Sequence, residues 1–197
     1  MRIAHRFRAA LSATSKVFSR SLDSFDPAPG AKNPYPERMV SYYYVQALAK
    51  ALAPARVLLE VPLTGKSGRG RDNHVDALVF NDREVVVAEF KRAWTPSHWG
   101  DLARDLARLR GPFAREIHQG FVDGRRRRAY VLLGADCWYL DVANAWKSGV
   151  SAKGWTLPPA FRRAHRDKLR VYNWPEGPDL DGYYFTWVLL PYDEMAA

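Results

Sequence analysis

The stretch His74-Val-Asp-Ala-Leu-Val-Phe-Asn-Asp-Arg-Glu-Val-Val-Val-Ala-Glu-Phe-Lys91 decides the fold that we expect for this chain. Two apolar runs flank a short polar segment, which is the pattern of a β-hairpin. The turn is either the two residues Asp82-Arg83 or the four residues 81–84. With either turn, Asp76 lies directly opposite Glu89, so two carboxylates face each other on paired strands.

The alternation of side chains along a strand divides the hairpin into a charged face and an apolar face. Glu89 and Lys91 share one face, His74 stands opposite Lys91, and Phe90 points the other way. The apolar face consists of Val75, Ala77, Val79, Val86, Ala88 and Phe90. Two directly opposed acids repel each other unless a proton or a cation relieves them, and a divalent ion is the simplest relief. A salt bridge of Lys91 with either acid at the rim of a sheet is the alternative.

The composition indicates one globular domain, 1–197, with a basic surface. The formal charge of +9 and the pI near 9.8 predict a polyanionic partner, with nucleic acid the first candidate and an anionic membrane surface the second. The single cysteine, Cys137, excludes an intramolecular disulfide and a cysteine-ligated zinc site. No run of 18 or more apolar residues exists, so we expect no membrane span. Residues 1–22 carry basic residues and no acid before Asp23, which fits either a transit peptide or a basic amphipathic arm, and with the arm we expect a cytoplasmic protein.

Hydrophobic periodicity orders the rest of the chain. Residues 1–30 are expected to form a basic N-terminal helix or arm. We expect further helices over 36–53, 97–117, 138–149 and 158–170, and strands over 56–63, 129–134 and 183–190. The exposed side of the 97–117 helix is expected to carry Arg104, Arg108, Arg110 and Arg115. Asp101 and Asp105 suit the dipole near the start of that helix. The predicted fold class is a mixed α/β sandwich, a central sheet with helices on both faces.

A glycine-rich basic loop, 64–72, lies before the hairpin. Its Lys66, Arg69 and Arg71 either clamp a phosphate next to the hairpin acids or form a solvated loop. The loop is not a Walker A motif, because the upstream glycine is missing and no helix follows. Glu60, in the preceding strand, faces either the same pocket as the hairpin acids or water.

The order of elements resembles that of the PD-(D/E)XK nuclease superfamily, whose members have the restriction-endonuclease-like fold. The resemblance covers residues 36–134, with Asp76 opening the second strand and Glu89-Phe-Lys91 closing the third. The residue before Asp76 is Val75, where the superfamily pattern has proline. Residues 135–197 would then be a C-terminal extension that ends in a strand.

The resemblance implies a role for each matching residue. Asp76 and Glu89 would be Mg²⁺ ligands, with Mn²⁺ as a substitute, and the carbonyl of Phe90 would add a third ligand. Lys91 would sit beside the attacking water. Some members also use a glutamate from the first core helix, and Glu37 matches it by position, although an acid in a first turn also stabilises a helix dipole.

The expected activity is therefore Mg²⁺-dependent hydrolysis of DNA by a restriction-like endonuclease, which would form a homodimer in order to cut both strands. The expected nucleic-acid-binding residues are Lys66, Arg69, Arg71, His74 and Arg92. One alternative is a nuclease-fold subunit that binds nucleic acid within a recombination, transposition or defence complex. Another is a peripheral membrane or structural protein that uses the basic N-terminal arm, although this leaves the hairpin acids unexplained.

Overall fold

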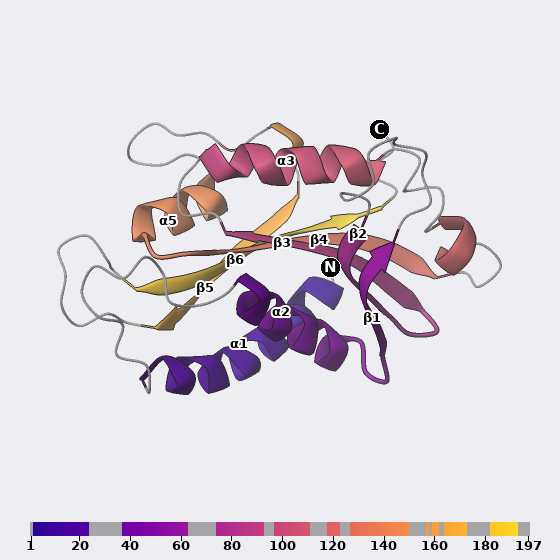
Figure 1. Cartoon of the computed structure of the whole chain (residues 1–197), viewed down its shortest axis with the longest axis horizontal. Helices are drawn as coiled ribbons and strands as arrows, with labels where there is room; N and C mark the ends of the chain where they lie inside the picture. The colour runs from indigo at the N-terminus through magenta and orange to yellow at the C-terminus, as the bar shows by residue number, and fades with distance from the viewer. Residues whose placement is uncertain are drawn as a thin grey trace.

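A six-stranded mixed sheet forms the centre of the protein, with strand order β1-β2-β3-β4-β6-β5 (Figure 1). The computed structural model describes residues 2–23, 37–62, 74–92, 97–110, 118–122, 127–149, 157, 159–161, 164–172 and 182–192. The strands are β1 (Arg56–Pro62), β2 (His74–Phe80), β3 (Glu84–Arg92), β4 (Arg128–Cys137), β5 (His165–Tyr172) and β6 (Tyr183–Pro191). Neighbouring strands are antiparallel except β3 and β4, which are parallel.

Helices cover both faces of this sheet, as the sequence predicted (Figure 1). One face is covered by α1 (Arg2–Asp23) and α2 (Glu37–Ala51), and the other by α3 (Ser97–Arg110) and α5 (Leu140–Ser148). Two short helical segments are η1 (His118–Val122) and η2 (Pro159–Phe161). The α/β class is confirmed. The expected 97–117 helix ends at Arg110, and residues 111–117 lie outside the described part of the chain.

The hairpin has the register that the sequence predicted. Ala77 pairs with Ala88 and Phe80 with Val85, which leaves 81–84 as the turn. The Asn81 side-chain oxygen accepts hydrogen bonds from the backbone N–H groups of Arg83 and Glu84, each at 2.8 Å. Asparagine favours turns because its side chain can replace a backbone acceptor in this way.

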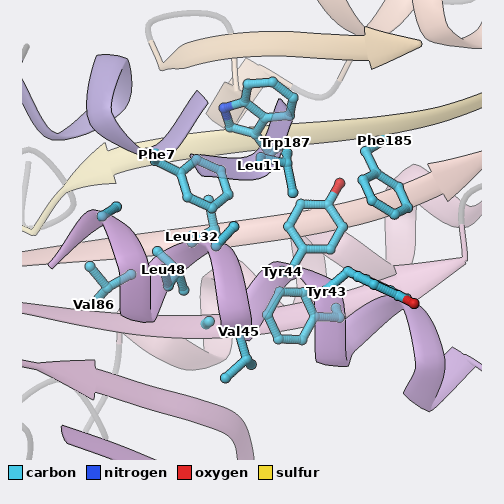
Figure 2. Packing of buried hydrophobic residues seen from close by; sticks show 14 of the residues in the cluster. Phe7, Leu11, Tyr43, Tyr44, Val45, Leu48, Val86, Leu132, Phe185 and Trp187 are labelled. Carbon is cyan, nitrogen blue, oxygen red and sulfur yellow. The ribbon is translucent and has the colours of Figure 1, made fainter. Parts of the chain in front are cut away.

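The apolar face of the hairpin packs under α1 and α2 (Figure 2). Tyr44 of α2 stacks on Phe90 with ring centroids 5.2 Å apart, and its hydroxyl donates to backbone carbonyls of β4 and β6. Gly134 of β4 makes this stacking possible, since a Cβ there would come within 2.8 Å of the Phe90 ring. Val75 departs from the prediction: it belongs to the cluster on the α3 face, because the regular pairing of β2 with β3 ends at Ala77.

The N-terminal helix is part of the core rather than a separate arm. Ile3, Phe7, Leu11 and Phe18 of α1 are buried against α2 and the sheet. Figure 2 shows Phe7 and Leu11 beside Trp187 of β6. The basic residues of α1 therefore belong to the outer side of a helix whose inner side is held by the fold.

The expected helix over 158–170 is wrong. The chain forms the short η2 turn and then the edge strand β5, which pairs antiparallel with β6. Leu169 and Val171 point to the core, and Lys168 and Arg170, which alternate with them, are charged. Only the C-terminal half of the segment therefore has the alternation typical of a strand. Pairing with β6 overrides the helical preference of the basic residues of this segment, Arg166, Lys168 and Arg170.

Candidate active site

The two hairpin acids lie side by side at the open end of the hairpin, on the α3 face of the sheet. Beyond the Ala77–Ala88 pair, the carboxylate of Asp76 accepts a hydrogen bond of 2.7 Å from the backbone N–H of Phe90. The carboxyl groups of Asp76 and Glu89 are also hydrogen-bonded to each other. The strand pairing thus brings together the two carboxylates that the register predicted to be opposite each other.

Burial changes the acidity of both groups. Glu89 is 2% exposed, and its pKa rises to about 9 because of burial first and the negative charge of Asp76 second. The pKa of Asp76 is also raised by burial, although the Phe90 hydrogen bond acts in the opposite direction. At neutral pH, one proton shared between the two carboxyl groups relieves their repulsion.

Helix α3 supplies two charged residues that the sequence did not place at the site. Arg108 forms an ion pair with the carboxylate of Glu89, and Asp105 lies 3.6 Å from the ammonium of Lys91. Arg108 also lies 3.5 Å from Asp105, one turn away on the same helix. The exposed position expected for Arg108 is therefore wrong, and Asp105 does more than interact with the helix dipole.

The spacing of α3 contained a signal for this arrangement. Asp105 lies three residues after Leu102 and four before Leu109, and both leucines are fully buried. A residue at these offsets lies on the same side of a helix as the leucines. The acid therefore had to point toward the sheet, although the sequence did not show which strand lay beneath it.

Glu60 of β1 extends the row of acids by one strand. It lies between the pairs Leu59–Ala77 and Val61–Val75, across from Asp76, and its charge contributes to the raised pKa of Asp76. The backbone of Glu60 has a φ of +50°, and its side chain is exposed. This exposure confirms the alternative that Glu60 faces water. Its carboxylate is still close enough to raise the pKa of Asp76.

The donors at this site are oxygen atoms, which is the chemistry that Mg²⁺ prefers. Mg²⁺ needs only one or two protein carboxylates, because water and substrate phosphate complete its octahedron. Asp76 and Glu89 fit that requirement. Among the residues that the structure describes, no group of three or more His, Cys, Asp or Glu side chains is arranged to hold a metal ion.

Known proteins offer no match. No family model, curated protein or solved structure matched this chain. The function must therefore be argued from the site itself.

Helix α2 begins at the same end of the sheet as the hairpin acids. Its C-terminal end is held at the β2–β3 turn, where the side chain of Asn81 donates to the carbonyl of Leu52 at 2.7 Å. The start of α2 is the end that lies far from that turn. Glu37 therefore lies toward the end of β3 where Lys91 is found. However, α2 covers the other face of the sheet, and the side chain of Glu37 lies outside the described part of the structure.

Two further predicted residues, His74 and Arg92, lie at the ends of β2 and β3. His74 is exposed at the start of β2, where it pairs with Pro62. Arg92 ends β3 beside Asp136 of β4, and its positive charge acts on Tyr183, which lies in the α2-side core. The three loop residues Lys66, Arg69 and Arg71 lie outside the described residues.

None of the described helices is long and apolar enough to cross a membrane.

Cys137, at the end of β4, is fully buried, and burial raises the pKa of its thiol far above the usual range. A buried thiol of this kind is a small core residue and not a nucleophile.

Proposed function

We propose that this protein is a Mg²⁺-dependent deoxyribonuclease of the PD-(D/E)XK type. The observation that carries the proposal is the pair of carboxylates, Asp76 and Glu89, held together on adjacent strands with Lys91 two residues further along β3. Buried acids are costly to keep near each other, so such a pair marks a functional site more often than a structural one.

The arrangement of elements supports the same proposal. Helix α2, the three antiparallel strands β1 to β3, helix α3 and the parallel strand β4 follow one another in the order αβββαβ. This is the core order of a restriction-endonuclease-like fold, with β5 and β6 added to the same sheet beside β4. The C-terminal extension is therefore built onto the proposed nuclease core.

Each residue then has a defined chemical task. Asp76, Glu89 and the carbonyl of Phe90 would hold a Mg²⁺ ion, which supplies positive charge next to the phosphoryl oxygens and makes a nearby water more acidic. Lys91 orients the attacking water and balances negative charge on the phosphoryl group. Its side chain is 39% exposed and already points into the site toward Asp105.

Cleavage of DNA tests the proposal. Purified protein should cut supercoiled or linear DNA with Mg²⁺ or Mn²⁺, and Asp76→Asn should lower the rate by about a hundredfold or more, since it removes a ligand carboxylate. Asp82→Asn is the matched control, because Asp82 is an exposed acid in the turn of the same hairpin. Absence of cleavage by the wild-type protein, or equal cleavage by Asp76→Asn, contradicts the proposal.

One observation favours a second candidate, a binding subunit without activity of its own. Glu89 contacts Arg108 and can share a proton with Asp76, so the two acids can be satisfied without a metal ion. In that case the isolated chain would bind DNA, would not cut it, and would be recovered from cells in a stable complex with another protein.

A further inference from the structure

A second charged surface lies at the β5 edge of the sheet, on the same face as the proposed nuclease site. It consists of Arg166, Lys168 and Arg170 of β5 with Lys147 of α5, and we call it the β5 basic edge. The three β5 residues pair with Val188, Thr186 and Tyr184 of β6. Val188 and Tyr184 belong to the core under α3 and α5, so the three basic side chains stand on that face too.

The strand register fixes where the β5 basic edge lies relative to the acids. One row across the sheet runs from Glu89 through Leu133 and Val188 to Arg166. The next row runs from Lys91 through Ala135 and Thr186 to Lys168. Three steps between strands separate the ends of each row, which is about 14 Å at roughly 4.8 Å for each step.

The basic side chains are held in place rather than spread into solvent. Lys168 and Arg170 lie over the ring of the buried Tyr184, at 5.6 and 5.8 Å from its centroid. Lys168 also donates a hydrogen bond to the side chain of Asn144 on α5. Cations that are already positioned lose less conformational freedom when they bind a phosphate.

Negative charge around the β5 basic edge is scarce among the described residues. Asp167 is the acid of β5 itself, but its side chain is 6% exposed and pairs with Arg8 at 2.5 Å and Lys147 at 3.7 Å. The pKa of Lys168 is lowered by burial first, and then by repulsion from Lys147 and Arg170. Like charges gathered in this way gain most from an anionic partner.

Protection of an exposed sheet edge is the simpler explanation, because edge strands often carry lysine and arginine to prevent aggregation. The opposite edge of this sheet argues against it. Strand β1 exposes Leu58 and Leu59 at 43% and 63%, together with Val57. Because β1 exposes apolar side chains at the other edge, protection of edges does not by itself explain the positive charge of β5.

We propose that the β5 basic edge binds backbone phosphates of the same DNA that is cut at Asp76 and Glu89. This inference rests on the proposed nuclease function. The two sites are roughly 14 Å apart across the sheet, which is close enough for one bound duplex to contact both. The β5 basic edge therefore sets the path of the DNA across the α3 and α5 face.

DNA binding measured in chelator, where no cleavage occurs, tests the inference. The variant Lys168→Gln with Arg170→Gln should bind duplex DNA about tenfold more weakly or worse. For this variant, the slope of log affinity against log salt concentration should also become shallower by about two, because two phosphate contacts are lost. The matched control is Arg2→Gln with Lys16→Gln, which removes the same charge from the exposed side of α1 on the other face. Equal losses in the two variants, or no loss in the β5 variant, overturn the inference.

Further measurements separate this inference from the nuclease proposal. The nuclease proposal depends on the cleavage rate of Asp76→Asn, whereas this inference depends only on DNA binding in chelator by the β5 variant and its control. If the β5 variant unfolds, Lys147→Gln replaces it, since Lys147 is 56% exposed on α5, and a loss of about threefold supports the inference while no loss overturns it. Tighter binding to vesicles of phosphatidylcholine and phosphatidylserine than to DNA at equal ionic strength also overturns it.

Discussion

Glu89 illustrates how much of this site is decided by a single residue. Its carboxyl group is buried, hydrogen-bonded to Asp76 and ion-paired with Arg108. Burial and Asp76 outweigh the arginine, so the pKa rises. The proton, the arginine and a divalent cation are three ways of relieving the same buried charge, and they compete with one another.

The raised pKa of Glu89 predicts how the stability of the metal-free protein depends on pH. The group binds a proton more tightly in the folded than in the unfolded chain, since its pKa moves from 4.5 to about 9. Its contribution is fully present below pH 4.5 and is lost as the pH rises toward 9. Urea unfolding in chelator should show a free energy of unfolding that falls across this range. Glu89→Gln, which is neutral at every pH, should flatten the curve, and an unchanged slope in that variant contradicts the prediction.

At the scale of elements, α3 carries the largest difference between expectation and structure. The sequence correctly predicted a helix here, and that helix buries Leu102, Leu106 and Leu109 at helical spacing. It did not predict that Asp105 and Arg108 reach across to Lys91 and Glu89. Helical periodicity tells which residues share a side, but the partner of that side depends on how the helix crosses the strands.

The contact between α3 and β3 predicts a pH-dependent effect of Arg108→Gln. Loss of the arginine leaves the Glu89 carboxylate without its counter-charge, which should cost on the order of 1–2 kcal/mol of unfolding free energy at alkaline pH. The cost should shrink at acidic pH, where Glu89 is protonated in any case. Arg104→Gln is the control, because Arg104 is exposed and pairs with Asp101 on the same helix. Equal costs for the two variants in urea unfolding would falsify the assignment of Arg108 to Glu89.

For the whole molecule, the N-terminal helix completes the core on the α2 side of the sheet. Phe7 lies edge to face with Trp187 at 5.6 Å, and Phe18 stacks on Phe185 at 5.5 Å. Two ion pairs, Arg6 with Glu84 and Arg8 with Asp167, tie the helix to β3 and β5. These contacts join strands from both ends of the sequence, so we expect the fold to unfold as one cooperative unit.

Deletion of residues 2–23 should therefore prevent stable folding. The deletion uncovers large aromatic side chains of the core, and apolar area of that size cannot be left in water without loss of cooperative folding. Near-ultraviolet circular dichroism should lose its aromatic signal, and thermal unfolding should lose its sharp transition. A truncated chain that still unfolds cooperatively would show that α1 is an appended arm. The variant Arg2→Gln with Lys16→Gln, which leaves the buried side of α1 intact, should unfold like the wild type.

The sequence by itself determined the features that depend on local periodicity. The hairpin register followed from strand alternation and from the turn at 81–84, so the meeting of Asp76 and Glu89 was predictable. The α/β class followed from the order of the apolar patterns. Pro62 ends the edge strand β1, a place that suits proline because it lacks the N–H that an interior strand must donate.

Only the tertiary structure decided which distant segments meet. The charged segment His165–Tyr172 became a strand because β6 offered it a partner, although its composition favoured a helix. Arg108 and Asp105 entered the site because α3 crosses over β3. Alternation and helical periodicity are properties of neighbouring residues, whereas strand pairing and helix crossing depend on burial shared by segments far apart in the chain.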